Sequence, residues 1–203
     1  MHPAFPRYCQ REPFVPEDRV MIFIDNSNLM YTNLTGKKID IGKLQKVLSN
    51  GRKLIRTYWY DGLHDVELLE KLGCQDPQLS TFKIQKDQKE SFIRDVLTKK
   101  LGVTPRLTPL KYKKASGKFE PYQKGVDVLM SSDMLWFALQ NAYDIAVAVT
   151  GDRDFIQVVQ RIKDTGKRVE IAHFSHIESK QGSGLLHYGD RYWKLDSLDI
   201  FMD

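Results

Sequence analysis

Runs of consecutive apolar residues alternate along this chain with stretches in which apolar residues recur every three or four positions. The first pattern predicts strands and the second predicts helices. Strands are expected at residues 20–24, 55–60, 79–85, 104–110, 145–149, 169–174 and 192–195. Helices are expected at residues 40–49, 65–73, 89–100, 126–140 and 154–163. This alternation predicts an α/β fold, a three-layer α/β/α sandwich with a mostly parallel central sheet.

The length of 203 residues predicts one globular domain, expected at residues 19–203. The first 18 residues hold four prolines and no apolar run, so we expect an extended N-terminal arm and no signal peptide. The two cysteines form no metal-binding or disulfide pattern, which favours a reduced, cytoplasmic setting. No apolar run approaches the roughly 20 residues of a membrane helix, so no membrane partner is expected.

Carboxylates follow two of the predicted buried strands at the point where each strand ends. Asp25 follows residues 20–24, and Asp152 and Asp154 follow residues 145–149. Parallel strands bring their carboxyl ends to one edge of a sheet, where functional groups gather. Asp127, at the start of the helix at 126–140, is a third source of negative charge for that edge. Because clustered carboxylates repel one another, the pattern favours a hard divalent cation, Mg²⁺ or Mn²⁺.

Each of these acids also has a plainer interpretation. Asp25 and Asp152 suit a turn or a helix N-cap, and Asp127 and Asp154 suit the first turn of a helix. Asp133 lies six positions after Asp127, about 120° away around a helix, and is expected to support the site rather than to bind metal. A metal site is favoured because two strand ends and a helix start supply acids together.

Three segments carry a resemblance to a known family. They are VMIFIDNSNL (20–29), KGVDVLMSSDM (124–134) and DIAVAVTGDRDFIQVVQRIKDTGKRVEIAHF (144–174). In order and spacing they resemble the NYN domain, a relative of the PIN nucleases, and most of all its LabA-like bacterial branch. The resemblance spans about residues 20–195 and implies a PIN-like, Rossmann-like fold with an acidic Mg²⁺ or Mn²⁺ site that hydrolyses RNA.

The resemblance also implies roles for individual residues. Asp25, Asp127 and Asp152 match the metal ligands, and Asp154 completes the catalytic group. The supporting residues would be Asn28, as a hydrogen-bond donor to a ligand carboxylate or to a phosphate, and Lys124. Lys124 would share the helix face of Asp127 if the helix begins early enough, and would either contact the scissile phosphate or moderate the charge of the acids. Arg153 stands where the family often has a small residue, and it is expected to contact substrate. The additional acid that PIN nucleases often carry on a mid-chain helix has no assigned position here, which leaves the number of metal ions open.

A basic stretch interrupted by aromatic residues, KYKKASGKFEPYQKG (111–125), precedes the helix at 126–140. Its charge and the net charge of +5 favour a polyanionic partner. The lysines are expected to contact RNA phosphates and the aromatic side chains to stack on bases. The alternative is a solvated loop. The residues expected to bind RNA are Lys111, Lys113, Lys114, Lys118, Tyr122 and Arg153, with Tyr112 and Phe119 as further stacking candidates.

The leading hypothesis is therefore a metal-dependent endoribonuclease acting on single-stranded RNA. The alternative is an RNA-binding or regulatory adaptor with little or no activity, and a homodimer is left open. A third hypothesis, an aspartyl-phosphate phosphatase built on Asp25, lacks the second aspartate of the D-x-D motif, where Ser27 stands.

Overall fold

A computed structural model describes residues 18–175 and 184–202 of the chain. Strands and helices alternate along it as the sequence predicts, and short turns of other helix types are labelled η. The strands are β1 (Arg19–Asp25), β2 (Lys53–Leu63), β3 (Thr104–Pro109), β4 (Lys111–Ala115), β5 (Lys118–Tyr122), β6 (Ile145–Val149), β7 (Arg168–His173) and β8 (Arg191–Lys194). The helices are α1 (Asn26–Thr32), α2 (Ile41–Ser49), α3 (Val66–Lys71), α4 (Gln78–Phe92), η1 (Ile93–Thr98), α5 (Val126–Leu139), η2 (Arg153–Phe155), α6 (Ile156–Asp164), η3 (Leu186–Tyr188) and η4 (Leu195–Ser197).

Six strands form the central sheet in the order β3-β2-β1-β6-β7-β8, and every neighbouring pair is parallel. The chain moves outward from β1 to β2 and β3, then returns to place β6 on the other side of β1. The strand order therefore reverses between β1 and β6. In open parallel sheets this switch point is where ligands bind.

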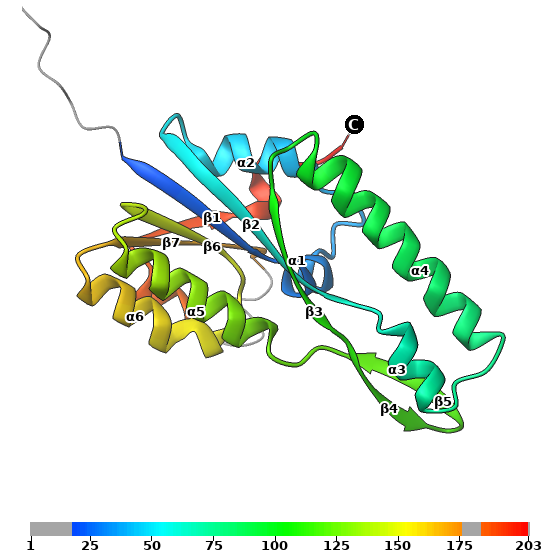
Figure 1. The fold of residues 1–203 in the computed structure, drawn as a ribbon. Helices are drawn as coiled ribbons and strands as arrows, with labels where there is room; N and C mark the ends of the chain where they lie inside the picture. Colours follow the sequence, from blue (N-terminus) through cyan, green and yellow to red (C-terminus); the bar gives the residue numbers. More distant parts are fainter. Residues whose placement is uncertain (1–17, 176–183, 203) are drawn as a thin grey trace, which may run out of the picture.

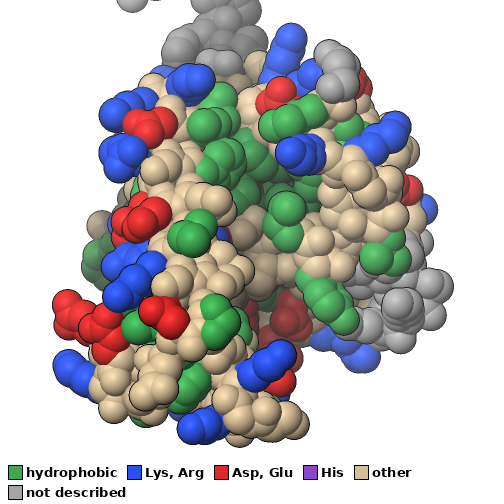
Figure 2. Space-filling model, turned by 90° about the vertical axis from the view of Figure 1, so that its right-hand side faces the viewer, with side chains coloured by type: hydrophobic (Ala, Val, Ile, Leu, Met, Phe, Trp, Pro, Cys, Tyr) green, Lys and Arg blue, Asp and Glu red, His purple; other side chains and the backbone are tan. Residues whose placement is uncertain are grey.

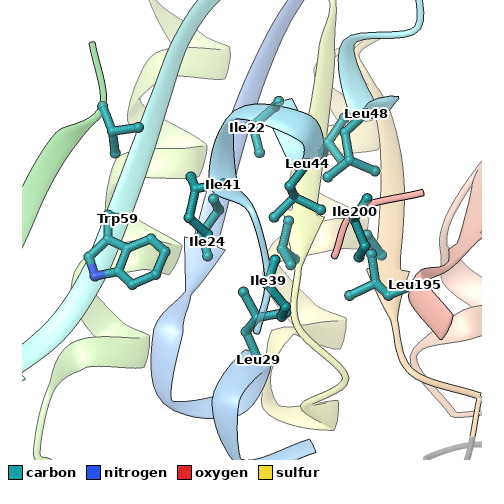
Figure 3. Close-up of a cluster of buried hydrophobic side chains, with 14 of the residues drawn as sticks. Ile22, Ile24, Leu29, Ile39, Ile41, Leu44, Leu48, Trp59, Leu195 and Ile200 are labelled. Atoms are coloured by element: carbon teal, nitrogen blue, oxygen red, sulfur yellow. The ribbon is translucent and has the colours of Figure 1, made fainter. Parts of the chain in front are cut away.

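The side chains of β1 alternate between two cores, one on each face of the sheet. Ile22 and Ile24 join a cluster with α2, η1 and the C-terminal segment, shown in Figure 3. Met21 and Phe23 join a second cluster with α5 and α6, which cover the other face (Figure 1). Helices on both faces confirm the predicted α/β sandwich with a parallel central sheet.

The basic stretch is not a loop but the antiparallel hairpin β4–β5, which extends beyond β3 beside α3 (Figure 1). A small apolar cluster anchors it, in which Phe119 packs with Leu69, Cys74 and Phe82. Residues 79–85, predicted to be a strand, belong instead to α4. The prediction was wrong because so short an apolar pattern fits either structure, and contacts such as that between Phe82 and the hairpin cluster favour the helix.

The helix predicted at 89–100 is the end of a longer helical segment, α4 followed by η1, that begins at Gln78. The other predicted elements are present with small shifts of their ends, and β3 is the edge strand expected at residues 104–110. Of the predicted N-terminal arm, only Asp18 falls among the described residues. None of the helices in the described part of the chain is both long and apolar enough to cross a membrane.

Candidate functional site

Asp25 ends β1 and is also the N-cap of α1, so one residue links the sheet to a helix start. Its side chain is buried, with 2% of the residue exposed. Oδ1 accepts hydrogen bonds from the Asn28 backbone N–H (3.1 Å) and the Ser27 hydroxyl (3.0 Å). Oδ2 accepts one from the Thr150 hydroxyl at 3.3 Å. The predicted cap is present, and it holds a carboxylate at the carboxyl edge of the sheet.

The end of β6 is tied to the end of β1 by side-chain hydrogen bonds. The Gly151 N–H donates to Asn28 Oδ1 at 2.9 Å, and the Asp152 N–H donates to Thr150 Oγ1 at 3.2 Å. Asp152 in turn caps η2 by accepting from the Asp154 N–H at 3.0 Å. The two strand ends predicted to carry acids therefore meet at the switch point, with Asn28 joining them.

Asp127 lies in the first turn of α5, which starts after Gly125 in a left-handed conformation (φ 87°). Partial desolvation raises the pKa of Asp127 above its ordinary value, and the negative charges of Asp25, Asp152 and Asp154 raise it further. Burial also raises the pKa of Asp25, with a smaller contribution from Asp152. The four predicted acids thus lie close enough to repel one another, although three different elements carry them.

This donor set suits a hard cation, because oxygen ligands and mutual repulsion both favour Mg²⁺ or Mn²⁺. Within residues 18–175 and 184–202, no three Asp, Glu, His or Cys side chains converge tightly enough to enclose an ion as they stand. Mg²⁺ usually keeps several waters and takes only one or two protein carboxylates directly. The acids therefore fit a cation held partly through water.

Asp61, which the sequence patterns did not single out, lies at the carboxyl end of β2 beside the site and is 2% exposed. The Lys89 ammonium lies 2.8 Å from Asp61 Oδ2, and Asn26 Nδ2 donates to the same oxygen at 2.7 Å. Oδ1 accepts from Gln123 Nε2 at 3.0 Å and from the Gly62 N–H at 2.7 Å. The available signal was an aspartate directly after the strand predicted at residues 55–60, the same position relative to a strand end that Asp25 occupies.

Two predicted supporting residues lie in or beside α5. Asp133 accepts hydrogen bonds from the Tyr60 hydroxyl (2.9 Å) and from Arg106 Nε (3.1 Å), so it joins α5 to the sheet. Lys124 precedes the Gly125 cap and lies outside α5, so it does not share a helix face with Asp127. The helix starts at Val126, as the sequence pattern indicated, with Gly125 as its cap.

The hairpin carries its predicted lysines along both strands. Lys111 and Lys118 are exposed, Lys113 pairs with Glu120 at 3.1 Å, and Lys114 lies over the Phe119 ring. Tyr122 is 44% exposed at the strand end nearest the site.

The other two predicted stacking residues of the hairpin make contacts within the protein. Phe119 is 8% exposed, and the Tyr112 hydroxyl accepts from the Asp65 N–H at 2.9 Å. Phe119 is therefore too buried to stack on a base, whereas stacking on the half-buried Tyr112 stays a prediction. Arg153 is exposed at the start of η2, between the two acids Asp152 and Asp154.

Comparison with known proteins gives one family and one solved structure. The model of the NYN domain matches residues 19–196. A crystal structure of a protein of unknown function from Vibrio parahaemolyticus matches with a TM-score of 0.61 and 18% identity, over 92% of this chain and 97% of that one. At that identity the likeness concerns the fold alone. No curated protein matches the chain.

Proposed function

Because this chain belongs to the NYN domain family, whose members are PIN-like nuclease domains, we propose that it is a metal-dependent endoribonuclease of the LabA-like branch. The observation that supports this most is the meeting of Asp25, Asp127 and Asp152 at the switch point, where the charges of Asp25 and Asp152 raise the pKa of Asp127. Single-stranded RNA is the proposed substrate, in a cytoplasmic setting, and a homodimer is not required by the site.

Each residue of the site would have a separate role in cleavage. Asp25 and Asp152, fixed by their hydrogen bonds, would hold Mg²⁺ or Mn²⁺ together with the more exposed Asp127. A bound cation of this kind lowers the pKa of water and stabilises charge that develops on the phosphate. Asp154 would orient the attacking water. Asn28, whose Oδ1 is occupied by Gly151, would use its Nδ2 group as the donor, and Lys124 and Asp133 would act from outside the ligand set.

Cleavage of end-labelled single-stranded RNA tests this function. We expect wild-type protein to give discrete internal products with Mn²⁺ or Mg²⁺ and none with EDTA. Asp152→Asn should abolish the products, because an amide cannot replace the negative ligand, although it can still cap η2. Circular dichroism and gel filtration check that the variant is folded. Asp164→Asn, which changes an exposed carboxylate at the end of α6, is the matched control.

Two results would contradict the proposal. Products that persist in EDTA or in Asp152→Asn would place the activity elsewhere or in a contaminant. RNA that stays intact in every metal, with folded protein that still binds it, would indicate the RNA-binding or regulatory alternative.

The hairpin is proposed to hold the RNA by its phosphates, through Lys111, Lys113, Lys114 and Lys118, with Tyr122 and Arg153 nearer the acids. Lys111 and Lys118 suit a test, since both are exposed. Each phosphate contact on a single strand changes the slope of log K against log salt by about 0.7. Lys111→Ala/Lys118→Ala should therefore weaken binding and make that slope about 1.4 less negative.

Fluorescence anisotropy of a labelled oligonucleotide at several salt concentrations measures this slope. Lys53→Ala is the matched control, because Lys53 is also exposed but begins β2 at the opposite edge of the sheet. An unchanged slope in the hairpin variant, or the same change in Lys53→Ala, would remove the hairpin from the RNA-binding surface.

A further inference from the structure

An apolar hollow of about 300 Å³ lies beside the acidic edge, between α1, α4 and the C-terminal segment. Figure 2 shows hydrophobic side chains gathered there, with acidic side chains below them. Trp59, Phe92, Ile93 and Met30 line its walls. Trp59 is 4% exposed, whereas Phe92 and Met30 are 40% and 55% exposed, so the hollow has a buried floor and open sides.

The two aromatic rings give this hollow a shape suited to a flat ligand. The Trp59 and Phe92 centroids lie 6.5 Å apart, and their planes meet at 65°. A planar ring stacked on one of them presents its edge to the other, and both arrangements are favoured between aromatic groups. The volume is at the small end of ligand pockets, which limits the occupant to a single small ring system.

The polar groups of the hollow gather at the end that adjoins the acids. Asn26 follows Asp25 directly, and its Nδ2 binds Asp61, which Lys89 also contacts. Asn26 Oδ1 is buried without a hydrogen-bond partner among the described residues, so an acceptor at this end lacks a donor. Lys38 also lines the hollow and supplies positive charge for an anionic ligand, whereas the Lys89 ammonium is paired with Asp61.

We propose that this hollow is a subsite for one nucleobase of the RNA strand whose phosphate lies at the acidic edge. A base has a flat apolar face that suits the aromatic walls and N–H donors at its rim that suit Asn26. Its attached phosphate suits Lys38. Asp61 already accepts from four donors, so it is not available to hydrogen-bond the edge of a base. Binding in the subsite therefore depends on stacking rather than on base-specific hydrogen bonds. The subsite rests on the proposed function for its substrate class.

Binding measured without metal tests the subsite separately from cleavage. The probes are labelled RNA decamers of each of the four bases and an abasic decamer of equal length and charge, with the full chain in EDTA. Stacking on an aromatic side chain predicts that at least one base-bearing decamer binds about tenfold more tightly than the abasic one. Phe92→Ala should remove most of that ratio. Ile84→Ala, an exposed residue of the same helix outside the hollow, should preserve it.

Met30→Trp provides a second variant, because it fills the hollow from an exposed position and should cause the same loss. Equal affinity for base-bearing and abasic RNA would overturn the proposal, as would equal losses in Phe92→Ala and Ile84→Ala. A dye such as 8-anilinonaphthalene-1-sulfonate that binds wild type but not Phe92→Ala, and that RNA bases do not displace, would show that the hollow takes another apolar ligand. If base-bearing RNA binds more tightly than abasic RNA but is not cleaved, the subsite stands and the nuclease function fails. If RNA is cleaved but base-bearing and abasic RNA bind equally, the nuclease function stands and the subsite fails.

Discussion

Replacing Asp25 by Asn is expected to lower the rate of RNA cleavage at least about 100-fold while making the metal-free protein more stable. Changes to outer-shell partners of a metal already cost 10- to 100-fold, and a ligand carboxylate should cost no less. Stability should rise by about 1 kcal/mol, a gain typical of relaxing a destabilised functional site. The reason is that Asp25 is buried, and no Lys or Arg among the described residues forms an ion pair with its carboxylate.

The substitution keeps the local geometry. Asparagine caps helices as well as aspartate does, so its Oδ1 can still accept from the Asn28 N–H and the Ser27 hydroxyl. Its Nδ2 would face the Thr150 hydroxyl, which can turn to accept. Asp25→Ala is the control for the cap, and it should lose activity and also lose about 1 kcal/mol of stability. Urea unfolding in EDTA gives both stabilities.

The pH dependence follows from the sign of the shift. A carboxyl whose pKa is raised in the folded state binds more protons there than in the unfolded state, so the free energy of unfolding falls as pH rises. For Asp25 this fall starts near the ordinary value of 3.8 and ends above its raised pKa. The stability gain of Asp25→Asn should therefore be present at pH 7 and vanish near pH 4.

Magnesium should reverse the order of stability, because a ligand that binds only the folded state stabilises it by mass action. Wild type should gain stability in Mg²⁺ and Asp25→Asn should gain little. An active Asp25→Asn variant, or one that Mg²⁺ stabilises as much as wild type, would exclude Asp25 from the metal site.

Removing Glu170 is expected to lower the free energy of unfolding by about 3–5 kcal/mol, because it leaves a charge without its partner in the core. Glu170 lies on β7, and its oxygens accept from Arg52 at 2.6 and 3.0 Å and from Trp193 Nε1 at 2.7 Å. The side chains of Arg52 and Glu170 are only 14% and 7% exposed. Glu170→Ala would leave the Arg52 guanidinium and the Trp193 N–H without the acceptor that they share.

A double-mutant cycle separates the pair from its packing. Arg52→Met/Glu170→Met removes both charges and should recover most of the loss, since apolar replacements of buried pairs are often neutral. Glu70→Ala breaks the half-exposed pair of Glu70 with Lys83 and should cost at most about 1 kcal/mol. A loss below about 1 kcal/mol in Glu170→Ala would show that Arg52 finds water or another partner.

The sequence alone determined the fold class and the position of the acids. Buried strands such as β6 are continuous apolar runs, and their ends are marked by polar residues, so the carboxyl edge could be predicted from the pattern. Asp25 and Asp152 were predicted to meet because parallel strands align their ends, and the Gly151–Asn28 hydrogen bond holds them together. The choice of reaction and metal rests on the family and on the experiments above.

Only the tertiary structure decided which polar and aromatic residues serve the site and which serve the core. The buried Asp61 carboxylate is paired with Lys89 from α4, and Phe119 is buried in the apolar cluster beneath the hairpin. Residues 79–85 became helical because Phe82 packs into that cluster. Such contacts join residues far apart in the chain, and local periodicity carries no information about them. The hollow beside the acids arises in the same way, since Trp59, Phe92 and Met30 meet there only when the layers pack.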